Sequence, residues 1–122
     1  MVGTDRDRMR DFAERYRDDG IVWYMEVYVS DHDDTVSALA SMRDSGWFEN
    51  VRGFVFGRPL FYDGNDYKDA VTSAIGDLGV SIVFDADVGH KAPRMTFVNG
   101  AIAEFDIRDG KCTLNYPELG LN

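Results

Sequence analysis

Apolar positions along the chain follow two spacings, one typical of helices and one typical of strands. Residues 5–19 carry apolar side chains three and four positions apart, between Asp and Arg residues, at Met9, Phe12, Ala13 and Tyr16. This spacing predicts an amphipathic helix. Residues 21–29 are mostly β-branched or aromatic, which predicts a strand that is apolar on both faces.

Helical and extended patterns then alternate as far as residue 84. A second helix is expected to end at Gly46, and the short apolar strand 53–57 follows it. A third helix is expected to end at Gly79, just before strand 80–84. Glycine favours such helix ends because it adopts the left-handed conformation without steric cost. Strands that alternate with helices are typical of α/β domains.

Beyond Pro93 the pattern changes from helices to hairpins. Asn99-Gly100 is a strong two-residue turn signal, and it separates the apolar runs 94–98 and 101–107. Asp109-Gly110 predicts a second hairpin in the same way. The C-terminal part of the chain is therefore expected to be rich in β-hairpins.

Together these patterns predict one α/β domain over residues 21–122, preceded by a helix or linker over residues 1–20. We expect a mixed sheet with flanking helices. A chain of 122 residues is the size of one ordinary domain. No run of about 18 apolar residues is present, so no membrane-spanning helix is expected.

The balance of charge is strongly acidic. The chain has 22 acidic and 13 basic residues, which gives a net charge of −9. Such a field repels phosphate groups, so neither nucleic acid nor a membrane surface is expected as a partner. The charged N-terminus lacks the apolar core of a secretory signal, and the single cysteine, Cys112, leaves no internal disulfide. A cytoplasmic location is therefore expected.

Glu26 is the only charged residue in the apolar stretch 21–29. A carboxylate inside such a run is costly unless it is hydrogen-bonded or has a chemical task. The alternative is an edge strand on which Glu26 points to water. The sequence leaves these two interpretations equally open.

Asp31, His32, Asp33 and Asp34 precede the second predicted helix. Asp and His are suitable metal ligands, but consecutive residues do not all converge on one ion. Acidic residues are also favoured at a helix start, where they cap backbone N–H groups and interact with the helix dipole. We therefore interpret this segment as a helix cap and not as a metal site.

The loop after strand 80–84 carries Asp85, Asp87, Gly89 and His90. Loops that leave the ends of strands are where open α/β sheets usually place their chemistry. A metal site is not expected here, because only one histidine is present and no paired ligand motif supports it. His90 is instead a candidate acid–base group.

Glu26 and His90 remain after other chemistries are considered. None of the serines lies in a G-x-S-x-G elbow, and no phosphate-binding glycine motif is present. Cys112 lies in a predicted hairpin with Lys111 as its only basic neighbour, so we interpret it as a structural thiol. A carboxylate and a histidine form the orienting and basic parts of a hydrolytic triad, but the nucleophile is missing.

The order of several motifs resembles the C-terminal domain of the LD-carboxypeptidases, a family of serine peptidases. The resemblance runs from about residue 21 to residue 116. It rests on four features in one order, namely Glu26 in an apolar strand, Gly53-Phe54-Val55-Phe56-Gly57-Arg58-Pro59, Gly89-His90-Lys91-Ala92-Pro93 and an apolar hairpin around Asn99-Gly100.

The resemblance implies a swivelling β/β/α-like fold and a Ser-Glu-His triad in which Glu26 and His90 supply the last two members. In this family the serine belongs to a separate N-terminal domain, which has no counterpart in these residues. The chain alone is then expected to be inactive. The family includes murein tetrapeptide carboxypeptidases and microcin C immunity proteins, so the implied substrate is a muropeptide or a peptidyl nucleotide.

Arg58, Asp87 and Arg94 are candidates for lining the substrate cleft. No metal or organic cofactor is implied. The face that the missing domain would cover favours self-association, so a homodimer is expected. The alternative function is a non-catalytic binding or regulatory module that retains the fold.

Overall fold

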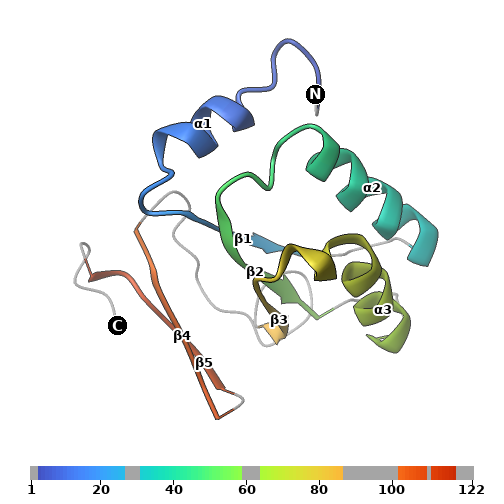
Figure 1. Ribbon diagram of the computed structural model, residues 1–122. Coiled ribbons are helices and arrows are strands. Elements are labelled where there is room, and N and C mark those ends of the chain that lie inside the picture. Colours follow the sequence, from blue (N-terminus) through green and yellow to red (C-terminus); the bar gives the residue numbers. More distant parts are fainter. Residues whose placement is uncertain (1–2, 27–30, 59–63, 87–101, 110, 118–122) are drawn as a thin grey trace.

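The computed structural model describes residues 3–26, 31–58, 64–86, 102–109 and 111–117 (Figure 1). Four helical segments and five strands lie in these residues. In chain order they are α1 (Met9–Arg15), β1 (Ile21–Met25), α2 (His32–Asp44), β2 (Val51–Gly57), α3 (Gly64–Ile75), the 3₁₀ turn η1 (Gly76–Leu78), β3 (Ser81–Ala86), β4 (Glu104–Arg108) and β5 (Lys111–Asn115).

Strands β1, β2 and β3 form a parallel sheet in that order, with β2 in the middle. The predicted α/β fold is confirmed. Strands β4 and β5 form a separate antiparallel pair, so within the described residues the parallel and antiparallel pairings belong to two sheets. Asp109 has a φ of 51°, as a tight hairpin turn requires, and the hairpin predicted at this position is present.

The ends of α2 follow the signals in the sequence. The side chain of Asp31 accepts a hydrogen bond from the backbone N of Asp34 at 2.8 Å, so Asp31 is the N-cap, as predicted. The helix ends at Asp44, and Gly46 has a φ of 83° just beyond it. Gly79 ends η1 in the same left-handed conformation.

Helix α1 is shorter than the stretch 5–19 that predicted it. Its first residue is Met9, because Asp7 folds the preceding residues into a turn. Asp7 Oδ1 accepts a hydrogen bond from the backbone N of Met9 at 2.9 Å, and its Oδ2 accepts one from the backbone N of Gly3 at 2.8 Å. These local bonds compete with the extension of the helix toward the N-terminus.

The hydrophobic core lies between the parallel sheet and the pair of helices α2 and α3, which pack side by side (Figure 1). Phe54 and Phe56 in β2 are 0% and 1% exposed. Their rings form an aromatic cluster with Phe48, Tyr67 and Phe84, with centroid separations of 4.9–6.1 Å. The central strand is therefore the best-buried element of the domain.

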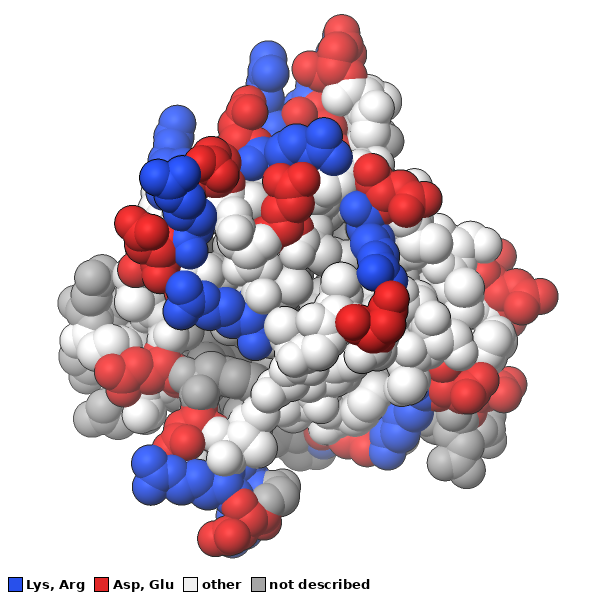
Figure 2. All heavy atoms as spheres, in the orientation of Figure 1, with Lys and Arg blue, Asp and Glu red and all other residues white. Residues whose placement is uncertain are grey.

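On the face seen in Figure 2, basic and acidic side chains intermingle over α1. Arg8 pairs with Asp11, Arg17 with Glu14 and Arg10 with Glu49. These exposed pairs match the interleaved charges that the sequence places around this helix. Among the described residues, no helix is both long and apolar enough to cross a membrane.

Candidate functional site

Two candidate residues, Glu26 and Arg58, follow parallel strands that end at one edge of the sheet. Glu26 directly follows β1, Arg58 directly follows β2, and Ala86 is the last residue of β3. Because parallel strands run in one direction, their carboxyl ends meet at the same edge. We call this the carboxyl edge. It is where open α/β sheets bind ligands.

The register of the sheet places Glu26 level with the end of β3. Met25 is paired with Phe56, so Glu26 continues that pairing opposite Gly57. Gly57 is in turn paired with Ala86. Two strand spacings therefore separate the backbones of Glu26 and Ala86, about 10 Å in all.

Glu26 is exposed, whereas all residues of β1 are partly buried. The strand ends at Met25, so the carboxylate lies just beyond the strand and avoids the cost of burial. An exposed carboxylate at the carboxyl edge is accessible to a substrate or to another domain.

The carboxyl end of β3 is held by a residue of α3. Lys68 Nζ lies 2.8 Å from Asp85 Oδ2 and 5.8 Å from the centroid of the Phe84 ring. Asp85 has a φ of 60°. A left-handed residue at this point changes the course of the chain just before it leaves the sheet. The sequence identified Asp85 but not its partner.

A second histidine lies at the N-terminus of α2. His32 Nε2 lies 3.0 Å from Asp69 Oδ2, and this hydrogen bond is the main cause that raises the pKa of His32 above 6.5. The sequence interpretation recognised the cap beside His32 but missed Asp69, which is 37 positions away. Within the described part of the chain, no group of three or more His, Cys, Asp or Glu residues is arranged to hold a metal ion.

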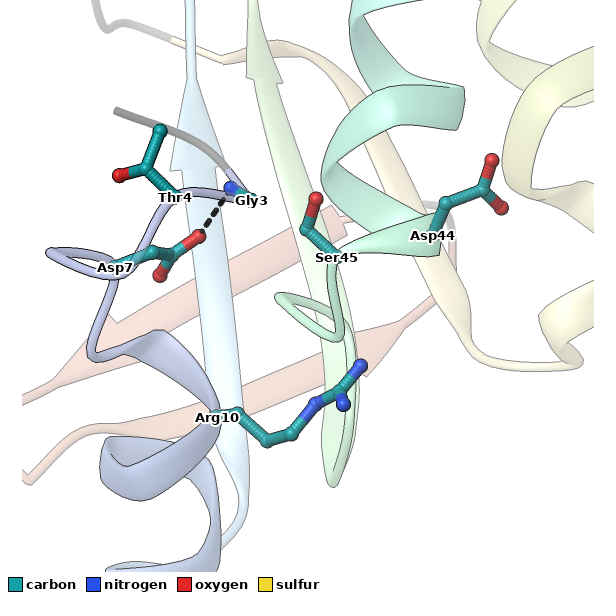
Figure 3. A pocket seen from close by; sticks show the side chains of 6 residues that line it. All are labelled: Gly3, Thr4, Asp7, Arg10, Asp44 and Ser45. Atoms are coloured by element: carbon teal, nitrogen blue, oxygen red, sulfur yellow. Dashed lines mark hydrogen bonds between the residues drawn. The ribbon is translucent and has the colours of Figure 1, made fainter.

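A shallow hollow of about 380 Å³ lies at the other end of α2, close to the N-terminal segment (Figure 3). Its lining residues are Gly3, Thr4, Asp7, Arg10, Asp44 and Ser45. The Asp7 carboxylate is already used: it accepts hydrogen bonds from the backbone of Gly3 and from Trp47 Nε1. These bonds hold the N-terminal segment to the domain. The hollow lies at the end of α2 that is remote from the carboxyl edge, so it is not part of that edge.

Two of the five candidate site residues lie in the described part of the chain, namely Glu26 and Arg58. Both follow directly on parallel strands at the carboxyl edge. The other three, Asp87, His90 and Arg94, lie outside the described residues. The pairing of Glu26 with His90 and the three cleft-lining positions therefore stay predictions.

A parallel α/β sheet with ionisable residues along its carboxyl edge is an arrangement typical of enzymes of this fold class. The family model of the LD-carboxypeptidase C-terminal domain matches residues 7–105. The chain therefore belongs to this peptidase family, and the resemblance read from the sequence is confirmed. A search of curated proteins and a search of solved structures gave no significant match.

Proposed function

We propose that this domain supplies Glu26 and His90 to the Ser-Glu-His triad of a serine-type LD-carboxypeptidase. The observation that carries the proposal is the register at the carboxyl edge. It places the backbone of Glu26 about two strand spacings, or about 10 Å, from Ala86. His90 follows Ala86 by four residues, which is enough chain to return across the edge.

In this mechanism each residue has one task. His90 takes the proton of the serine as general base and later donates it to the leaving amine as general acid. Glu26 holds the imidazole in the productive tautomer and stabilises its cationic form. The position of Glu26 supports this assignment, because it lies at the same edge of the sheet as the end of β3, the strand that precedes His90 in the sequence.

The proposed substrate has an amide bond that follows an L-centre, as in the L,D bond of a muropeptide or a related bond in a peptidyl nucleotide. Arg58 lies at the carboxyl edge beside Glu26 and is proposed to line the cleft together with Asp87 and Arg94. The reaction calls for no metal or cofactor. The proposed setting is the cytoplasm, with the serine on a separate domain and with self-association as a homodimer.

Titration of His90 tests the Glu26–His90 pair directly. The chain has two histidines, so the NMR signals of His32 provide an internal reference in the same sample. A nearby carboxylate favours the imidazolium, so Glu26→Gln should lower the pKa of His90 by about one unit and leave His32 unchanged. The matched control is Glu49→Gln, since Glu49 follows α2 and is paired with Arg10 at 3.3 Å.

If Glu26→Gln and Glu49→Gln leave the same pKa at His90, the proposed pair is wrong and a binding module becomes the better interpretation.

An activity assay completes the test. The 122-residue chain should not hydrolyse a muropeptide tetrapeptide. In a protein that also contains the serine domain, His90→Ala should reduce kcat by about 10⁶-fold. Robust turnover by the chain alone would contradict the assignment of the serine to another domain.

A further inference from the structure

Strand β3 ends in a β-bulge. Val55 is paired with Val83, and Gly57 is paired with Ala86, so two steps along β2 correspond to three steps along β3. The extra residue falls at Phe84–Asp85, where Asp85 has a φ of 60°. Residues other than glycine seldom adopt this conformation, although Asp tolerates it better than most.

A bulge at this position decides which face of the sheet Ala86 lies on. Successive side chains of a strand point to opposite faces, so one inserted residue reverses the alternation for everything after it. Ala86 is the first residue beyond the inserted one, and it is still paired with Gly57. Asp87 and His90 come next in the sequence. The bulge therefore lies in the last described residues before Asp87 and His90.

Lys68 is the side chain that holds the bulge. Its ammonium lies 2.8 Å from Asp85 Oδ2 and 5.8 Å from the centroid of the Phe84 ring, so it contacts both residues of the bulge. Phe84 is in turn stacked on Phe56 and packed edge-on against Tyr67. The inserted residue is thus connected to the aromatic core through one lysine of α3.

The ion pair itself is half exposed, with side-chain exposures of 43% for Lys68 and 49% for Asp85. Pairs of this kind contribute little to global stability, because solvent screens them. Their effect is local. The pair favours one backbone conformation at Asp85 over the extended alternatives that a regular strand end would adopt.

We propose that Lys68 and Asp85 are positioning residues, whose ion pair holds the bulge that directs the chain from β3 toward the catalytic histidine. This inference rests on the proposed function, because the direction of the chain matters for catalysis only if His90 is the base. Neither residue is proposed to touch the substrate.

Three variants separate positioning from simple stabilisation. Lys68→Met removes the charge but keeps an unbranched apolar stem beside Phe84. Asp85→Gly removes the ion pair but favours the left-handed backbone. Asp85→Val removes the pair and disfavours that backbone, because a β-branched residue is strained at positive φ. Lys111→Met, at an exposed lysine of β5, is the matched control.

Two NMR readouts apply to the 122-residue chain. The first reports the backbone at the bulge, through the three-bond coupling that depends on φ of residue 85 and the amide shifts of residues 84–86. The second is the titration of His90. Lys68→Met and Asp85→Val should change the first readout and move the pKa of His90 toward about 6.5, the value of a free imidazole. Lys111→Met should leave both readouts close to those of the unmodified chain, and Asp85→Gly should leave the titration of His90 close to it. In a protein with the serine domain, kcat should fall by up to about 10²-fold for Lys68→Met, with KM unchanged, and should be retained in Asp85→Gly.

The comparison of Lys68→Met with Asp85→Gly is decisive, because both lose the ion pair and only one loses the preference for the bulge. Equal effects of the two on His90 would overturn the proposal, as would an unchanged coupling at residue 85 in Lys68→Met. The proposed function fails separately, if Glu26→Gln does not move the pKa of His90. In that case the coupling at residue 85 still decides whether Lys68 holds the bulge.

Discussion

The imidazole of His32 joins α2 to α3 at the carboxyl edge, and its protonation sets the strength of that link. Nε2 lies 3.0 Å from Asp69 Oδ2, and Nδ1 lies 3.4 Å from Asp33 Oδ1. The hydrogen bond to Asp69 raises the pKa of His32, although a helix N-terminus by itself disfavours a cation. The folded chain thus favours the protonated imidazole more than the unfolded chain does.

A pH-dependent stability follows from this pair. Because the pKa is higher in the folded state, the stabilisation is fully present below about pH 6.5 and is lost as the pH rises through the folded-state pKa. In urea unfolding, the difference in stability between the unmodified chain and His32→Gln should therefore shrink from about pH 6 to about pH 8.5. Asp69→Asn should remove most of this dependence.

Asp33→Asn provides the control, because the Asp33 side chain is 99% exposed and its contact with His32 is the longer one. It should leave most of the pH dependence in place. Equal losses in the two variants would contradict the assignment of Asp69 as the main partner of His32.

The residues of the site differ in how far the sequence predicts them. Asp31 was predicted as a helix cap because capping depends on residues only three positions apart. The pairs His32–Asp69 and Lys68–Asp85 join positions from different elements, and such contacts form only when the helices pack on the sheet. Glu26 was found because a charge in an apolar run is a local anomaly.

At the scale of elements, the sequence predicts the order of helices and strands better than their ends. Gly46 and Gly79 mark helix ends through their own backbone preference. The early start predicted for α1 was wrong, because Asp7 bonds to the backbone of Met9 and Gly3 instead of extending the helix. The bulge in β3 was not predicted, because the strand was expected to end at residue 84 with Asp85 in the following loop, whereas β3 extends to Ala86.

The buried aromatic side chains of β2 pack the helices on the sheet. Their contribution to the free energy of unfolding can be predicted. Phe54 is fully buried, and the centroid of its ring lies 4.9 Å from that of the Phe48 ring. Phe54→Ala removes this packing and leaves a cavity, so it should lower the free energy of unfolding by about 3–5 kcal/mol in urea titrations.

Phe12→Ala is the matched control for the core variant. Phe12 is 41% exposed on α1, so its removal should change the free energy of unfolding by no more than about 0.5 kcal/mol. A comparable loss in both variants would mean that α1 is packed more tightly against the domain than its exposure indicates.

At the scale of the molecule, different kinds of contact lie at the two ends of α2. The carboxyl edge gathers the exposed Glu26, the His32–Asp69 pair and the Lys68–Asp85 pair. The opposite end is fastened by structural bonds, including that from Trp47 Nε1 to Asp7. These ionisable residues thus lie at the end of the sheet where open parallel α/β folds usually bind ligands.

The net charge of −9 acts on the whole molecule, and its effect on stability can be measured through ionic strength. Like-charge repulsion opposes the compact state, and salt screens it over a Debye length of about 10 Å at 0.1 M. The exposed ion pairs around α1 are screened too, but each contributes little. The melting temperature at pH 7 should therefore rise between about 0.02 M and about 0.3 M sodium chloride. Near pH 4.5, the isoelectric point of the sequence, this rise should disappear. A melting temperature that falls with salt at pH 7 would show instead that favourable ion pairs outweigh the acidic excess.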